Sequence, residues 1–74
     1  MITIIGAEGC RPCERLKAAL GREGIAYEYM DESDERAQPI LRFYEIEDGP
    51  FPAVIKDGML LPPMTKDQYM RSLR

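Results

Sequence analysis

Cys10 and Cys13 are the residues of this sequence best suited to chemistry, and they are its only two cysteines. Both lie in the run Gly9-Cys10-Arg11-Pro12-Cys13, after the apolar residues 2–5 and before an amphipathic helical pattern. A helix that begins at Cys10 would place its sulfur among unpaired backbone N–H groups, at the positive end of the helix dipole. Such surroundings, with the neighbouring Arg11 cation, lower a cysteine pKa from about 8.5 to roughly 3.5–7.5. The motif therefore predicts a reactive thiolate at Cys10.

The spacing of the two cysteines predicts how they would act together, because two intervening residues bring the sulfurs within bonding reach. The Cys10 thiolate would attack a substrate disulfide. Cys13, one helical turn later and more buried, would then attack the mixed disulfide and release the reduced substrate. A disulfide between these cysteines would add little to stability, since closing so short a loop removes only about 2 kcal/mol of unfolded-state entropy. We therefore interpret both cysteines as catalytic.

Length and composition indicate one soluble globular domain over residues 1–74, folded without a partner, and we expect a monomer. The net charge of −3 and the absence of a Lys/Arg cluster argue against nucleic acid as a ligand. Charge is nevertheless uneven, because residues 28–35 are acidic whereas the first helical segment is basic, with Arg11, Arg15, Lys17 and Arg22. We interpret the basic face as a solvated helix surface, with steering of an acidic partner as the alternative.

The sequence also predicts a compartment. The first apolar run is four residues long and is followed by Gly6 and Glu8, which does not fit a secretory signal, and no stretch approaches transmembrane length. We therefore expect a cytoplasmic protein without a membrane partner, in which the cysteine pair cycles between dithiol and disulfide.

Apolar spacing predicts a strand–helix–strand unit in the first half of the chain. Residues 2–5 form a buried strand, residues 7–9 form a loop, and a helix of about 12 residues follows, with Gly24 at its left-handed C′ position. Residues 25–31 are rich in aromatic residues and are expected to form the second strand. This length and order indicate a right-handed βαβ unit.

The second half predicts a helix, a hairpin and a final helix. Proline suits the first position of a helix, so a short helix is expected to begin at Pro39, with one apolar face made by Ile40, Leu41, Phe43, Tyr44 and Ile46. After a turn at residues 47–50, strands at 52–56 and 59–61 are joined at Asp57-Gly58, a type I′ hairpin signal. A capping box at residues 65–68 then opens a helix that runs through Leu73.

The predicted order is β-α-β-α-β-β-α in the α/β class, with a four-stranded mixed sheet flanked by helices. This is a minimal thioredoxin-type architecture. Nearly the whole chain resembles the glutaredoxin family of the thioredoxin superfamily. The resemblance rests on this order of elements, on Cys10-Arg11-Pro12-Cys13, on the Gly24-Ile25 junction and on Phe51-Pro52-Ala53-Val54. The resemblance implies a dithiol-disulfide oxidoreductase acting in electron transport, with disulfide-containing proteins or glutathione-mixed disulfides as substrates.

The resemblance also implies a set of substrate-binding residues. The Phe51-Pro52 peptide bond would be cis, turning the Phe51 backbone towards the cysteines so that its N–H and C=O can pair with an extended substrate. Arg11 would stabilise the thiolate, or be a solvated surface arginine. Pro12 would fix the first helical turn and, by its likeness to the proline of thioredoxin, favour a more reducing potential. Helix N-termini bind anions, so the backbone N–H groups of residues 65–67 and the Lys66 ammonium would hold a carboxylate, although capping by Thr65 alone explains these residues equally well.

Two departures from the family bear on the electron source. Glutaredoxins commonly carry a basic residue three positions before the first cysteine, where this chain has Ala7, followed by Glu8. Their paired glycines after the hairpin are replaced by residues 61–64, Leu-Pro-Pro-Met. The reductant is thus left open between glutathione and thioredoxin reductase with NADPH. With these two departures, the sequence resembles more closely the glutaredoxin-like proteins that serve ribonucleotide reductase and take electrons from thioredoxin reductase.

Two other functions remain as alternatives. Structural zinc needs four ligands, and with no histidine and no third cysteine only a homodimer could complete a four-thiolate or an iron–sulfur site, so we expect no bound metal and no resident cofactor. A non-catalytic binding module would use an exposed apolar surface instead. Its candidate residues, which more often belong to a core, are Tyr44, Phe51, Met59 and Met64.

Overall fold

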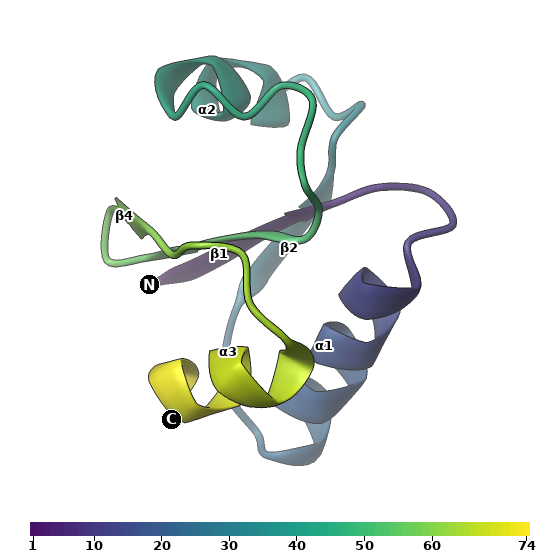
Figure 1. The fold of residues 1–74 in the computed structure, drawn as a ribbon, viewed down its shortest axis with the longest axis vertical. Coiled ribbons are helices and arrows are strands. Elements are labelled where there is room, and N and C mark those ends of the chain that lie inside the picture. Colours follow the sequence, from purple (N-terminus) through teal and green to yellow (C-terminus); the bar gives the residue numbers. More distant parts are fainter.

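A four-stranded mixed sheet forms the centre of the computed structural model, which describes residues 1–74 (Figure 1). The strand order is β2-β1-β3-β4, in which β1 runs parallel to β2 and antiparallel to β3, and β3 runs antiparallel to β4. This order and the mixed sheet confirm the predicted architecture. The elements are β1 (Ile2–Gly6), α1 (Arg11–Arg22), β2 (Glu28–Asp31), α2 (Ala37–Phe43), β3 (Ala53–Lys56), β4 (Met59–Leu60) and α3 (Lys66–Leu73).

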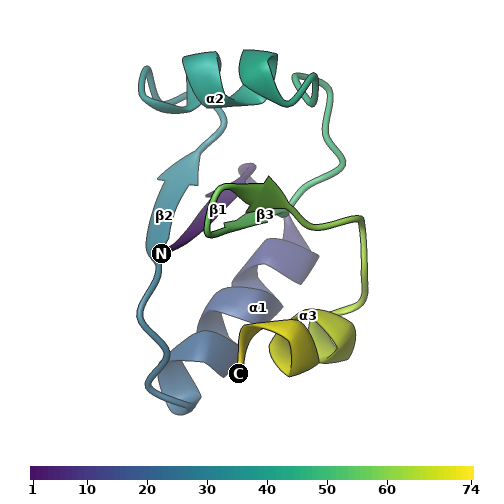
Figure 2. The same ribbon diagram turned by 90° about the vertical axis from the view of Figure 1, so that its left-hand side faces the viewer.

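Helices cover both faces of the sheet. Helix α2 lies over one face, and α1 and α3 lie over the other (Figure 1, Figure 2). Successive side chains of a strand point to opposite faces, so Ile4 packs with the α1 and α3 side chains while Ile5 packs with those of α2. Both isoleucines are fully buried. Burial on both faces explains why the first strand is largely apolar, with isoleucines at the adjacent positions 4 and 5, instead of strictly alternating.

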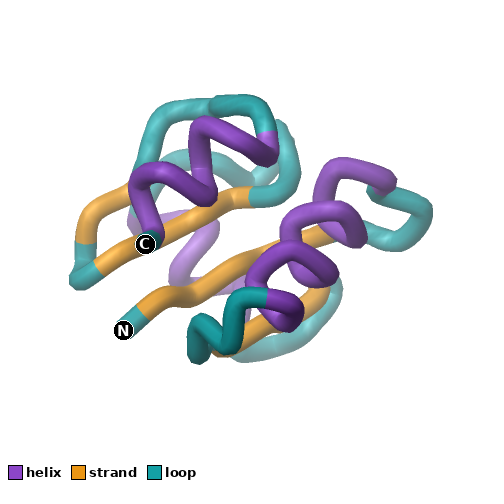
Figure 3. Tube along the Cα trace, turned by 90° about the horizontal axis from the view of Figure 1, so that it is seen from below, coloured by secondary structure: helices purple, strands orange, loops and turns teal.

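Helices α1 and α3 lie next to each other on their face of the sheet (Figure 3). Leu16 and Leu20 of α1 and Leu73 of α3 belong to the same buried cluster. At the far end of both helices the Arg74 guanidinium donates two hydrogen bonds of 2.8 Å to the Glu23 carboxylate. Helix α1 is therefore held along its length, which fixes its first turn relative to the sheet.

The first half of the chain follows the predicted pattern, with one shorter element. Helix α1 is 12 residues long and is followed by Gly24 at a φ of 67°, the left-handed conformation expected there. Strand β2 covers four residues, whereas the sequence predicted a strand over residues 25–31. Its ladder with β1 begins at the pair Thr3 and Glu28, so residues 25–27 only lead the chain from α1 back to the sheet edge.

The second helix begins two residues earlier than predicted, at Ala37 instead of Pro39. Proline is tolerated at this third position, because the first four N–H groups of a helix have no acceptor within it. The helix also ends earlier, at Phe43, and Glu45 then takes a φ of 58°. The predicted apolar face is wrong at Phe43, whose exposed fraction is 79%.

The hairpin turn and the last helix are confirmed, whereas both hairpin strands are one residue shorter than predicted. Strand β3 begins at Ala53 instead of Pro52, which has no N–H for the ladder, and β4 ends at Leu60 instead of Leu61.

Asp57 and Gly58 have φ values of 51° and 82°, as a type I′ turn requires. The Tyr44 hydroxyl donates a 2.7 Å hydrogen bond to the Gly58 carbonyl and so ties the hairpin to the end of α2. At α3 the capping box is complete: the Thr65 hydroxyl accepts from the Gln68 N–H, and the Gln68 side chain accepts from the Thr65 N–H.

Candidate active site

The two cysteines stand at the point where the chain leaves the sheet and enters α1. Cys10 is the N-cap of the helix and Cys13 lies in its first turn. Their sulfurs are joined in a disulfide, with the Cα atoms 5.3 Å apart. Cys13 is fully buried, whereas Cys10 is partly exposed. The first sulfur can therefore meet a partner molecule, and the second is reached only through the first.

The sulfur of Cys10 takes the place that a serine or aspartate oxygen usually takes at a helix N-terminus. The backbone of Cys10 is extended, and its Sγ accepts a hydrogen bond from the Cys13 N–H at 3.2 Å. In the dithiol form the same N–H and the positive end of the helix dipole favour the thiolate over the thiol.

Two residues between the cysteines shape this first turn. Arg11 is exposed and forms no ion pair, so its charge is free to act on the sulfur or on a bound molecule. Pro12 is also exposed and stands in the first turn of the helix, where its fixed φ suits the helix and its missing N–H is not needed.

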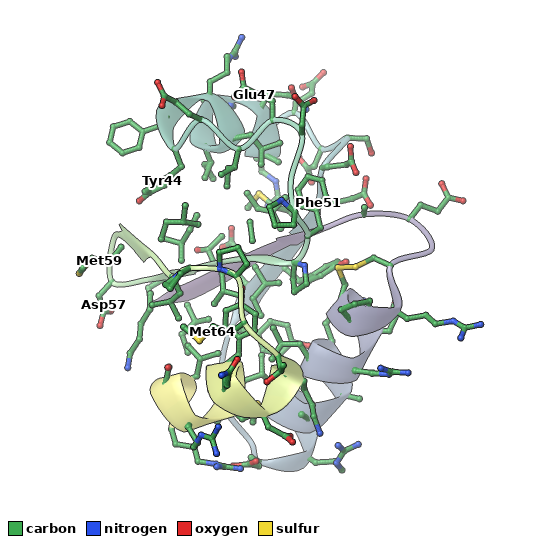
Figure 4. The ribbon with its side chains drawn as sticks, in the orientation of Figure 1. Tyr44, Glu47, Phe51, Asp57, Met59 and Met64 are labelled. Carbon is green, nitrogen blue, oxygen red and sulfur yellow. A yellow bond between two sulfur atoms is a disulfide. The ribbon has the colours of Figure 1, made fainter.

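The segment before β3 forms the other side of the site. The Phe51-Pro52 peptide bond is cis, and so is Gly49-Pro50, which the sequence analysis did not foresee. The Phe51 carbonyl oxygen lies 3.7 Å from Cys10 Sγ. This is a contact and not a hydrogen bond in the disulfide form, because the bonded sulfur carries no proton. Neither the N–H nor the C=O of Phe51 takes part in a backbone hydrogen bond of the fold. Figure 4 shows Phe51 beside the disulfide.

Thr65 and Lys66 are not joined to the cysteines by any hydrogen bond or ion pair. The Thr65 hydroxyl is engaged in capping α3, and the Lys66 ammonium pairs with the Asp67 carboxylate at 2.9 Å. Pro62 and Pro63, which precede them, provide no N–H groups for an anion. The contacts of these residues are therefore those of a helix cap.

An open depression of about 400 Å³ lies at Cys10 and the first turns of α1. Sequence reasoning identified Cys10 and Arg11 there but missed the part that Glu14 and Arg15 take in it. The available signal was the helical spacing, since residues three and four apart share one face of a helix. The lining residues are Gly9, Cys10, Arg11, Glu14 and Arg15.

A second group of side chains supports the loop that leads to the site. The Lys17 ammonium lies 4.0 Å from the centre of the Tyr29 ring and 3.2 Å from the Glu14 carboxylate. The hydrogen bond that the Lys17 ammonium donates to the Glu14 carboxylate raises the pKa of Lys17, and burial raises the pKa of Tyr29. The Tyr29 ring occupies the place where a side chain at Gly6 would begin. Gly6 thus lets the tyrosine pack beneath the last residue of β1, a role that the sequence analysis missed.

The four apolar residues proposed for a docking module do not form one surface. Tyr44 and Met59 lie together near β4, whereas Phe51 lies near the disulfide and Met64 lies next to α3 (Figure 4). Only Met59, with an exposed fraction of 70%, is largely open to solvent. Phe51 packs partly against the core cluster beneath α2, and Met64 packs against the cluster beneath α1 and α3.

No group of three or more Cys, Asp or Glu side chains is arranged to hold a metal ion. None of the three helices has the length and apolarity needed to cross a membrane.

Comparison with known proteins finds the same fold in solved structures. A threonine-to-alanine variant of the thioredoxin-like protein BC3987 superposes with a TM-score of 0.80 and 25% sequence identity, over 100% of both chains. The unsubstituted protein BC3987 gives a TM-score of 0.77 at 25% identity, over 96% of this chain and 97% of that one. No family model and no curated protein matches the sequence. A thioredoxin-like fold with a CxxC disulfide supports a role of the redox type.

The difference in burial predicts selective alkylation of the dithiol form. After reduction, iodoacetamide should label Cys10 in the native protein, whereas Cys13 should be labelled only once a denaturant opens the core. Mass spectrometry of peptides after labelling measures both. Equal labelling of the two cysteines under native conditions would contradict the assigned roles of an accessible and a buried thiol.

Proposed function

We propose that this thioredoxin-like protein is a thiol-disulfide oxidoreductase that reduces the disulfides of other proteins through Cys10 and Cys13. The observation that carries the proposal is the Cys10 sulfur at the N-cap of α1, partly exposed and in hydrogen-bond contact with a backbone N–H. A thiolate is the nucleophile in disulfide exchange, and this position favours the thiolate.

The reaction consists of two exchange steps. In the first, the Cys10 thiolate attacks one sulfur of the substrate disulfide, which forms a mixed disulfide and releases the other substrate sulfur as a thiolate that takes a proton from water. In the second, Cys13 loses its proton and attacks Cys10, which forms the disulfide seen here and releases the second substrate thiol. Two electrons pass from the protein to the substrate. The burial of Cys13 keeps it from reacting until Cys10 has captured a substrate.

The Phe51 segment supports binding of an extended substrate. Its C=O stands beside the reactive sulfur, and neither its C=O nor its N–H is used in a backbone hydrogen bond of the fold. Two backbone hydrogen bonds to these groups would hold a substrate strand with its disulfide next to Cys10. Pro52 adds no competing N–H. Arg11 places a positive charge near the thiolate formed in the dithiol state and near any acidic group of the substrate.

As the reductant we propose thioredoxin reductase with NADPH in preference to glutathione. The capped N-terminus of α3, the paired Lys66 and the prolines at 62 and 63 leave few groups at the start of α3 for a glutathione carboxylate. By the same likeness to glutaredoxin-like proteins, ribonucleotide reductase is a candidate electron acceptor. We propose that the protein acts as a monomer in the cytoplasm, where a dithiol of this kind can be regenerated.

Two cysteine variants test the two-step cycle. Cys10→Ser removes the nucleophile and should lower the reduction of insulin disulfides to the uncatalysed background. Cys13→Ser keeps the nucleophile but cannot resolve the mixed disulfide, so it should accumulate a covalent adduct with the substrate that thiol reagents release. Turbidity of insulin and non-reducing electrophoresis measure these outcomes. Full activity of Cys13→Ser on protein disulfides would rule out the two-thiol cycle, and full activity of Cys10→Ser would rule out the function.

A coupled assay tests the electron source. The oxidised protein is offered either to NADPH with thioredoxin reductase or to NADPH with glutathione and glutathione reductase, and loss of NADPH absorbance is followed. We expect the faster rate with thioredoxin reductase, because Thr65 and Lys66, the α3 residues expected to bind a glutathione carboxylate, are already engaged. A faster rate with glutathione would overturn the proposed reductant while leaving the oxidoreductase function in place.

A further inference from the structure

Charge is divided between the two helical layers of the molecule. The segment that contains α2 is dominated by acidic residues, whereas α1, which carries the reactive sulfur, is predominantly basic. The chain as a whole has a net charge of −3. The helix that bears the nucleophile is thus opposite in sign to the molecule. The acidic residues of the α2 segment are Asp31, Glu32, Asp34, Glu35, Glu45, Glu47 and Asp48.

Two arginines of α1 stand beside the reactive sulfur without a partner. Arg11 and Arg15, four residues apart on one face of the helix, line the depression next to Cys10, and both are exposed. Glu14, the one acidic residue that lines the depression, forms an ion pair with the Lys17 ammonium at 3.2 Å. Other basic side chains, such as Arg36 and Arg74, form ion pairs within the chain, whereas Arg11 and Arg15 form none.

A guanidinium presents a planar set of donors that matches a carboxylate, so two free arginines around one depression form a receptor for acidic groups. Charges on such a surface also act at a distance, since complementary charge raises the rate of encounter with an acidic partner and disfavours a basic one. Both effects act at the nucleophile, because Cys10 forms one wall of the depression.

We propose that the protein substrate carries an acidic residue next to its disulfide, and that this carboxylate binds Arg11 and Arg15 while the disulfide meets Cys10. The inference rests on the proposed oxidoreductase function and names its substrate class. It also sets an orientation. The acidic side of the substrate lies over the Arg11 and Arg15 side chains of α1, and its backbone lies along Phe51, whose carbonyl oxygen is 3.7 Å from the sulfur.

Three disulfide-bonded peptides that differ only in the residues beside one cysteine, glutamate, glutamine or lysine, test the preference. The measured quantity is kcat/KM for reduction. The wild-type protein should favour the glutamate peptide over the lysine peptide by about tenfold, at the lower end of the range for charge-steered association. In about 1 M salt, where the screening length falls to about 3 Å, the preference should disappear.

Arg15→Glu should lower the ratio of kcat/KM for the glutamate peptide to kcat/KM for the lysine peptide by about fivefold. This factor corresponds to the upper end of the range of free energies measured for exposed ion pairs. The matched control is Arg22→Glu, which makes the same charge change at an exposed, unpaired arginine in the last turn of α1. Position 22 lies about 18 Å along the helix from Cys10, beyond the screening length at physiological salt. The glutamate-to-lysine ratio of the Arg22→Glu protein should therefore stay within about twofold of the wild-type ratio.

The outcomes separate this proposal from the function on which it rests. Reduction of all three peptides at equal rates, or an equal effect of Arg15→Glu and Arg22→Glu, would overturn the acidic-substrate proposal and leave the oxidoreductase function standing. Failure to reduce any of the peptides, together with failure to reduce insulin, would instead refute the function itself. Circular dichroism of both variants checks that a loss of rate is not a loss of fold.

Discussion

The hydrogen bond from the Cys13 N–H to the Cys10 sulfur is the interaction on which the proposed chemistry depends. It makes the first cysteine the cap of helix α1, so the sulfur lies where the helix best accommodates a negative charge. The same backbone turn brings the second cysteine to the first, with Cα atoms 5.3 Å apart. One local conformation thus supplies both the activation of the nucleophile and the position of the thiol that resolves its adduct.

The rest of the fold keeps that turn in place. Leu16 and Leu20 are fully buried and anchor α1 to the sheet, while Gly6 ends β1 above the Tyr29 ring and leads into the loop before Cys10. The strand neighbours of β1 are β2 on one side and β3 on the other. Because β3 is preceded directly by Phe51 and Pro52, the central position of β1 also brings the Phe51 carbonyl to within 3.7 Å of the sulfur. Two segments far apart in the sequence therefore meet at one edge of the sheet.

Features set by local sequence were predictable, and those set by packing were not. The N-cap cysteine, the Gly24 helix end, the Asp57-Gly58 turn and the capping box each follow from one or two residues with a strong conformational preference. The start of α2 was placed wrongly because a proline fits either the first or the third position of a helix. Phe43 was assigned to the core because helical spacing does not reveal where the helix stops facing the sheet.

The candidate site was predictable to a similar extent. Cys10, Cys13 and Arg11 follow from the motif, and Phe51 and Pro52 were placed by family resemblance. The capping role of Thr65 was predictable from the capping box, but sequence alone did not show that Lys66 pairs with Asp67, nor that Arg15 lines a depression with Cys10, because both depend on side-chain positions in three dimensions. The division of charge between the α1 and α2 layers was visible in the sequence, but its relation to the sulfur required the fold.

The central claim is that the helix N-terminus holds Cys10 as a thiolate, and a pH titration of the Cys13→Ala protein tests it most directly. This variant keeps the backbone N–H at position 13 and leaves a single thiol, whose ionisation is followed by ultraviolet absorbance. A midpoint of about 7.5 or lower is the predicted result, within the range for cysteines at helix N-termini. A midpoint near 8.5, the value of a free cysteine in water, would contradict the claim.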